Sequence, residues 1–310
     1  MPRATLVATM RDEGPFILEW IAYHRLIGFD DILVCTNDCV DASPALLDVL
    51  QERGLVRHLR CTPAANEKAQ LVAYREAEQV LADDWPDLLM VLDADEFLNI
   101  HVGDGRLPAL LAAVPGATAF MLSWRVFGSS GHGHWSPELT TRRFTRAAKR
   151  ESGVNWSYKT LFTNPQAYHC PLLPHGPGFA REEHVDHIRP VDGAGRPLPR
   201  RYARSEEFLQ SEPGTVSWAL AQVNHYNTRS WADYLAKHAR GGGQGPERWA
   251  RDENWAVFDR NEEEDRSIQR WLPALDALLA TWLTDDAVRV ALERCRMLYA
   301  RHVAGLETAA

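Results

Sequence analysis

Three carboxylates stand at the end of an apolar run, in the stretch LLMVLDADEFLNI that spans residues 88–100. The run predicts a buried strand with Asp93 and Asp95 at its carboxyl end, where a parallel sheet binds its ligands. Carboxylate oxygens suit Mg²⁺ or Mn²⁺, and such an ion can hold a diphosphate and neutralise a departing phosphate. The alternative is that Asp93 caps a loop and that Asp95 and Glu96 are exposed to solvent, because acidic turns are common.

Strand and helix patterns alternate through the first 125 residues. Apolar runs predict strands at 4–9, 31–36, 55–60, 87–93 and 118–124. Helical spacing of apolar residues predicts helices at 14–29, 43–54 and 66–84. Because the strands are almost continuously apolar, the pattern predicts an α/β fold with a mostly parallel sheet that is covered by helices on both faces.

The chain changes character after the fifth predicted strand. Residues 128–204 are rich in Gly, Pro, His and Arg and show little periodicity, so we expect an irregular segment that carries or covers a site. From residue 205 onward the pattern is helical. Amphipathic segments at 230–240 and 287–303 are separated by the glycine-rich stretch RGGGQGP.

Composition narrows the choice of partners and compartment. The net charge of −8 disfavours a nucleic-acid partner. No apolar stretch approaches the ~20 residues of a membrane span, so membrane association is expected to be peripheral at most. The N-terminal stretch has no apolar secretory region, and the five cysteines are scattered. We therefore expect a cytoplasmic protein with reduced thiols.

Four segments, taken in order, resemble bacterial glycosyltransferases related to glycosyltransferase family 2, which have the Rossmann-like GT-A fold. The segments are RDEGPFILEWIAYHRLIGFDDILVCTND, DADEF, WRVFGSSGH and NHYNTRSWADYLAKHARG, and the resemblance covers residues 4–243. It implies a nucleoside-diphosphate-sugar donor, with a UDP-sugar expected, and a saccharide or glycoconjugate acceptor. It also implies a divalent metal, Mn²⁺ or Mg²⁺.

The resemblance divides the chain into three parts. Residues 1–125 form the nucleotide-sugar-binding α/β part, residues 126–245 the acceptor-side part of the same catalytic domain, and residues 246–310 a C-terminal helical extension. The implied metal ligands are Asp93, Asp95 and His225, with His175 as the alternative histidine.

The donor-binding residues that the resemblance implies come from the ends of the first, second and fourth strands: Arg11, Asp12, Glu13, Asp38 and Asp93. Near Asp38 the family's usual D-N-x-S-x-D reads TNDCVD, so Thr36 replaces the first aspartate. Lys237 and Arg240 share a helix face and can clamp a diphosphate, although a solvated helix face has the same pattern. We also expect residues 225–245, with Gly241, Gly242 and Gly243, to be mobile without donor and ordered with it.

The acceptor side is expected to include Trp124, Gly128 and His132, with Trp124 stacking on a sugar ring. Relatives mostly invert the anomeric configuration by direct displacement, which needs a carboxylate base near the acceptor. Asp186 and Glu151 are the two candidates, and the sequence does not choose between them. Two other functions stay open: a nucleotidyltransferase that uses the same metal–diphosphate chemistry, and a non-catalytic sugar-binding module.

Overall fold

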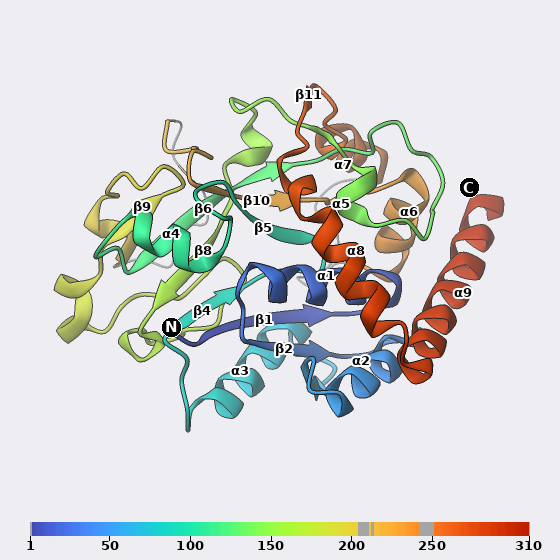
Figure 1. The fold of residues 1–310 in the computed structure, drawn as a ribbon, viewed down its shortest axis with the longest axis horizontal. Helices are drawn as coiled ribbons and strands as arrows, with labels where there is room; N and C mark the ends of the chain where they lie inside the picture. The colour runs from blue at the N-terminus through green and yellow to red at the C-terminus, as the bar shows by residue number, and fades with distance from the viewer. Residues whose placement is uncertain (1, 204–210, 212–213, 242–250, 310) are drawn as a thin grey trace.

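A mixed sheet forms the centre of the molecule (Figure 1). The computed structural model describes residues 2–203, 211, 214–241 and 251–309. Within these residues the strand order is β3-β2-β1-β4-β8-β6-β10-β5, and β9 pairs with β6. The strands are β1 Ala4–Met10, β2 Asp31–Thr36, β3 Arg57–Arg60, β4 Leu88–Val91, β5 Glu96–Ile100, β6 Ala119–Val126, β8 Tyr158–Thr163, β9 Pro190–Asp192 and β10 Ala221–His225. A small separate ladder joins β7 Arg146–Ala147 to β11 Glu263–Glu264.

Helices connect and cover these strands. They are α1 Gly14–Ile27, α2 Ser43–Glu52, α3 Ala69–Leu81, α4 Leu107–Ala113, α5 Thr140–Arg143, α6 Trp231–Arg240, α7 Arg251–Phe258, α8 Leu272–Trp282 and α9 Asp286–Ala309. Short 3₁₀ turns lie at η1 Gly153–Asn155, η2 Pro165–Ala167, η3 Glu182–His187, η4 Arg200–Ala203 and η5 Ser267–Trp271. No helix within the described residues is long and apolar enough to cross a membrane.

The predicted α/β class is confirmed by the half of the sheet that carries the strand–helix alternation. Strands β3, β2, β1 and β4 are parallel neighbours, as continuous apolar strands require. Alternate residues of β1 enter different cores: Leu6 and Ala8 face the core of α1, whereas Val7 faces the core of α3. Helices therefore cover both faces of this half, as predicted.

The other half of the sheet departs from the sequence prediction. Strand β8 lies antiparallel between β4 and β6, and β5 pairs antiparallel with β10. The prediction of an irregular segment was wrong at β8, whose sequence YKTLFT is buried almost throughout. A buried Lys159 in this strand hides the apolar pattern by which a strand is recognised.

The C-terminal helices pack on the helices that cover the parallel half of the sheet. Helices α8 and α9 lie over α1, and Leu275, Leu292 and Cys295 belong to the same apolar core as Leu6. The prediction of a helical C-terminal region is therefore confirmed, and the division into three functional parts stays a prediction. Figure 1 shows α9 running along the edge of the molecule toward which the arrows of β1 and β2 point.

Helix α1 carries a buried histidine that makes stability depend on pH. His24 Nδ1 donates to the carbonyl of Trp20 at 2.8 Å, and its Nε2 accepts from the amide of Leu98 at 3.4 Å. Both ring nitrogens are thus used by the neutral imidazole. Burial lowers the pKa of His24 from 6.5 to about 3, although the bond to Trp20 opposes the shift.

We expect this histidine to destabilise the protein as the pH falls. Between pH 6.5 and 3 the unfolded chain binds a proton at His24 that the folded chain excludes, so the free energy of unfolding should fall by about 1.4 kcal/mol per pH unit. The test is urea unfolding of wild type and His24→Leu between pH 4 and 6. The free energy of unfolding should change more steeply with pH in the wild type than in His24→Leu, by this amount. The control His187→Leu, at an exposed histidine, should show the wild-type slope. Parallel slopes for wild type and His24→Leu would contradict the assignment.

Candidate functional site

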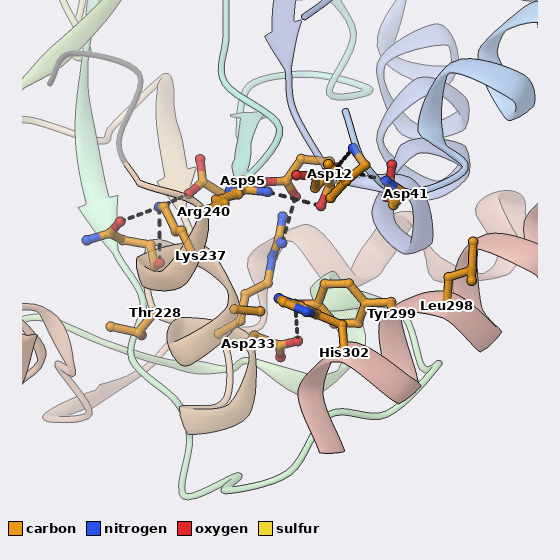
Figure 2. Close-up of a pocket in the computed structure, with 15 residues that line it drawn as sticks. Asp12, Asp41, Asp95, Thr228, Asp233, Lys237, Arg240, Leu298, Tyr299 and His302 are labelled. Carbon is orange, nitrogen blue, oxygen red and sulfur yellow. Dashed lines mark hydrogen bonds and ion pairs between the residues drawn. The ribbon is translucent and has the colours of Figure 1, made fainter. Parts of the chain in front are cut away.

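A cavity of about 180 Å³ opens at the carboxyl ends of the parallel strands (Figure 2). Its walls come from the loops after β1, β2, β4 and β10 and from helices α6 and α9. The lining residues are Asp12, Glu13, Val40, Asp41, Asp95, Asn227, Thr228, Arg229, Asp233, Ala236, Lys237, Arg240, Leu298, Tyr299 and His302. The parallel sheet therefore places polar groups at the edge where such sheets bind ligands.

Asp95 is the charged centre of this cavity. Its side chain was expected to be exposed under the alternative interpretation, but only 6% of the residue is accessible. Lys237 Nζ donates to Asp95 Oδ2 at 2.6 Å, and His225 Nε2 lies 3.7 Å from the same oxygen. Burial would raise the pKa of Asp95, but Lys237, His225 and Arg229 hold it well below its ordinary value. Asp95 is therefore an ionised carboxylate that is paired with the ammonium group of Lys237.

Asp93 and Glu96 share a second, buried cation. Lys159 Nζ lies 2.8 Å from Asp93 Oδ2 and 2.9 Å from Glu96 Oε2, and it also donates to the carbonyl of Pro174. Glu96 is fully buried rather than solvated, and its Oε2 accepts from the amide of Asp93 at 2.8 Å. Burial would lower the pKa of Lys159, but Asp93 and Glu96 raise it above the ordinary value. Lys159 thus fixes the turn that carries Asp93 and Asp95.

Glu13 organises the basic side chains of the cavity. Its buried carboxylate accepts from Arg229 at 2.9 Å and from Arg240. Arg229 also donates to the carbonyl of Ala94, and Arg240 to the carbonyl of Asp12 at 3.0 Å. Burial would raise the pKa of Glu13, but Arg240 and Arg229 lower it, so the carboxylate is ionised. Glu13 therefore holds two guanidinium groups beside Asp95.

Asp12 shapes the loop after β2. Its backbone has a positive φ of 53°, and its Oδ1 accepts from the amides of Val40 at 2.7 Å and Asp41 at 3.1 Å. Asp41 in turn accepts from Gly14 and Ser43. Within the described ranges, Asp12, Asp41 and Cys39 are the group of three side chains whose ligand atoms come close enough together to share a metal ion. Because these carboxylate oxygens accept backbone hydrogen bonds, the group is explained by loop structure.

The predicted metal ligands do not form such a group of three among the described residues. Asp95 and His225 do lie together, whereas the Oδ2 of Asp93 is bound by Lys159. The buried Nδ1 of His225 has no hydrogen-bond partner within the described part of the chain. It is the other ring nitrogen, Nε2, that lies 3.7 Å from Asp95 Oδ2, and a carboxylate oxygen with an imidazole nitrogen at this separation fits a divalent cation such as Mn²⁺.

Trp124 packs against His225 at the edge of this site. The ring centroids of Trp124 and His225 are 4.2 Å apart, and those of Trp124 and His175 are 5.7 Å apart. His175 Nδ1 donates to the carbonyl of Tyr158 at 2.9 Å. Burial, and next the charge of Lys159, lower the pKa of His175 to about 4, so this imidazole is neutral at pH 7. The alternative metal ligand His175 thus lies next to Trp124 and near Asp93 and His225 of the predicted set.

Four other residues that were predicted to bind the donor or the acceptor do not line the cavity. Arg11 and Asp38 are exposed at the ends of β1 and β2, and neither lines the cavity. Gly128 packs on the backbone of Arg260, where a Cβ atom would lie 2.5 Å from its carbonyl oxygen. His132 is exposed, and its ring meets Phe144 edge to face.

Neither candidate for the catalytic base lines the cavity. Glu151 is exposed and lies 3.6 Å from Arg150. Asp186 is exposed in the turn η3. The structure therefore brings Asp12, Glu13, Asp95, Lys237 and Arg240 together and leaves both candidate bases outside.

Helix α6 is held in place at both ends. Ser230 Oγ accepts from the amide of Asp233, whose carboxylate in turn accepts from the amide of Ser230, which is a complete capping box. Toward its other end Lys237 and Arg240 reach Asp95 and Glu13. Gly242 and Gly243 lie outside the described residues, so the predicted ordering of residues 225–245 on donor binding stays a prediction.

Sequence reasoning missed Lys159 and the α9 residues of the cavity wall. A lysine inside a strand is ordinarily read as a solvent-facing residue. Leu298, Tyr299 and His302 fit the pattern of an ordinary amphipathic helix, so nothing local distinguishes them. The burial of Arg229 against Glu13 also follows only from the fold.

No protein-family model matches the chain, and no curated protein matches it in sequence. Among solved structures the chain is similar to S. aureus TarS, with 10% identity and a TM-score of 0.32, over 52% of this chain and 28% of that chain. It is also similar to glucosyl-3-phosphoglycerate synthase from Mycobacterium tuberculosis in complex with Mn²⁺, UDP and glucosyl-3-phosphoglycerate. That match has 14% identity and a TM-score of 0.28, over 40% of this chain and 44% of that chain. This chain therefore spans less than half the length of either protein.

Proposed function

We propose that this chain is a metal-dependent glycosyltransferase that moves a sugar from a UDP-sugar to a hydroxyl of a saccharide or glycoconjugate. The observation that carries the proposal is the ionised, buried Asp95 at the carboxyl edge of the parallel sheet, with three basic side chains around it. A strand-end carboxylate next to groups that bind phosphate is what a nucleoside-diphosphate donor requires. The four motifs that resemble family 2 glycosyltransferases supply the sugar-transfer chemistry.

The charge of the cavity supports the need for a metal. Five carboxylates line it against three basic side chains, namely Asp12, Glu13, Asp41, Asp95 and Asp233 against Arg229, Lys237 and Arg240. A diphosphate entering alone would meet excess negative charge. Asp95 and His225, with Asp93 beside them, are the residues that would hold a divalent ion. When bound, the ion would neutralise the charge that develops on the leaving diphosphate.

Lys237 forms an ion pair with Asp95 in the absence of a metal ion. Its Nζ also donates to Asn227 Oδ1 at 2.6 Å, so the ammonium has a second partner. If a metal ion displaces Lys237 from Asp95, the lysine can donate to a phosphate oxygen. Arg240, whose side chain is 18% exposed beside Glu13, can also donate to a phosphate oxygen. These side chains would bind and orient the diphosphate.

On the acceptor side, Trp124 would offer its ring to a sugar, with Gly128 and His132 nearby in sequence. An inverting displacement needs a carboxylate to take the acceptor proton, for which Asp186 and Glu151 remain the candidates. Because neither lines the cavity, an acceptor would have to meet either one outside it.

The donor is tested by a panel of nucleoside diphosphates with and without Mn²⁺. We expect UDP with Mn²⁺ to raise the melting temperature more than GDP or CMP does. A ligand present at a hundred times its Kd should add about 2.7 kcal/mol of apparent stability. Thermal-shift measurement with each nucleotide checks this. A larger stabilisation by GDP or CMP would contradict the uridine donor, and equal shifts with and without Mn²⁺ would contradict the metal.

A further inference from the structure

Helix α9 forms a wall of the cavity that no sequence motif explains. Leu298 and His302 are four residues apart and so share one helix face, with Tyr299 beside them. The resemblance to glycosyltransferases ends before this helix. Figure 2 shows Leu298, Tyr299 and His302 on α9, below Asp12 and Asp41 in this view, with His302 and Tyr299 on the side of Asp233.

This wall is fixed rather than loosely docked. Tyr299 OH donates to Asp233 Oδ1 at 3.0 Å, and Asp233 is the residue that completes the capping box of α6. The Tyr299 ring also meets Phe16 edge to face, with ring centroids 5.5 Å apart. Helices α1, α6 and α9 therefore hold one another, and this fixes the position of the α9 helix at the cavity before any ligand arrives.

The two ends of the cavity differ in chemistry. One end has the ion pairs of Asp95 with Lys237 and of Glu13 with the two arginines. On the α9 side the cavity has the half-buried Leu298 and the exposed imidazole of His302, and its lining also includes the apolar Val40 of the loop after β2 and Ala236 of α6. An anionic group suits the first end, and a flat, uncharged ring with a polar edge suits the second.

The ion pairs and the α9 side chains line one and the same cavity, so a single donor molecule can reach both. If the base lies against α9, the diphosphate lies toward Lys237 and Arg240, whose side chains are of the kind that bind phosphate.

We propose that α9 forms the nucleobase wall of the donor site, with Leu298 against the face of the base and His302 at its polar edge. The proposal rests on the proposed function, since it assigns a place to one part of the same donor. It makes Leu298 and His302 the residues that select the base, whereas Asp95 and Lys237 act on the phosphates common to all donors.

Calorimetric titration in the presence of Mn²⁺ separates these roles. For Leu298→Ala and for His302→Ala we expect the affinity for UDP to fall about tenfold and the preference for UDP over GDP to narrow. The affinity for pyrophosphate, which has no base, should stay at the wild-type value. The conservative variants Leu298→Met and His302→Gln should lose less of the affinity for UDP than the alanine variants do. Met297→Ala is the matched control, because Met297 is an exposed neighbour on α9 that does not line the cavity.

Unchanged UDP affinity in both folded alanine variants would overturn the nucleobase wall and leave the proposed function standing. An equal loss of UDP and pyrophosphate affinity would also overturn it, because α9 would then act on the phosphates or on the fold. If the wild-type protein binds neither UDP nor any other nucleoside diphosphate with Mn²⁺, the proposed function fails, and the nucleobase wall fails with it.

Discussion

Asp95→Asn is expected to abolish Mn²⁺-dependent binding of UDP while the protein remains folded. The substitution keeps the size of the side chain and removes the negative charge, which the neighbouring basic side chains stabilise in the wild type. Lys237 loses its ion pair but keeps Asn227 Oδ1 at 2.6 Å, so no cation is left stranded in the interior. A direct metal ligand should matter at least as much as its supporting residues, whose loss costs about 10–100-fold in metal affinity.

Calorimetry with UDP and Mn²⁺ measures this effect, and circular dichroism checks the fold. Asp104→Asn is the matched control, since Asp104 is an exposed aspartate that does not line the cavity. It should bind UDP as wild type does. Wild-type UDP affinity in Asp95→Asn would remove Asp95 from the donor site.

Lys159→Met is expected to cause the largest loss of stability of any single change considered for this protein. The substitution leaves Glu96 fully buried with no ammonium beside it, and it takes the cation from Asp93 as well. Breaking a buried ion pair on one side costs about 3–5 kcal/mol, because the remaining charge is uncompensated. Urea unfolding measures the change in the free energy of unfolding.

Two variants complete this test. Lys149→Met makes the same change at an exposed lysine and should alter stability by less than about 0.5 kcal/mol. The double variant Lys159→Met with Glu96→Gln should recover part of the loss, because it removes a buried charge. A loss of under about 1 kcal/mol in Lys159→Met would mean that the buried charges are compensated by other groups.

The parallel half of the fold was predictable because its signals are local. Strand β1, helix α1 and strand β2 each show one clear period, and Gly28 ends α1 in the left-handed conformation with φ 113°. Strand β8 was missed because Lys159 and Thr160 face inward, which contradicts the usual apolar pattern of a buried strand. Its partners Asp93 and Glu96 were visible as carboxylates but not as members of a buried ion-pair cluster.

The candidate site was predictable only in part, because most of its contacts join residues that are far apart in the sequence. The position of Asp95 after an apolar strand is a local signal, whereas its partner Lys237 is 142 residues away along the chain. The pairing of Glu13 with Arg229 spans 216 residues. Leu298 and Tyr299 reach the cavity only because α9 packs on α1, α2 and α6. Spacing in a sequence identifies strand ends, but it does not show which distant helix closes over them.

The central claim is that a divalent ion and the phosphates of UDP meet at Asp95. Anomalous diffraction from a crystal grown with UDP and Mn²⁺ tests it most directly, because manganese is located independently of the protein atoms. We expect a manganese peak within ligand distance of the Asp95 carboxylate and of a UDP phosphate, with Lys237 moved away from Asp95. A peak between Asp12, Cys39 and Asp41 instead, or UDP bound away from Asp95, would contradict it.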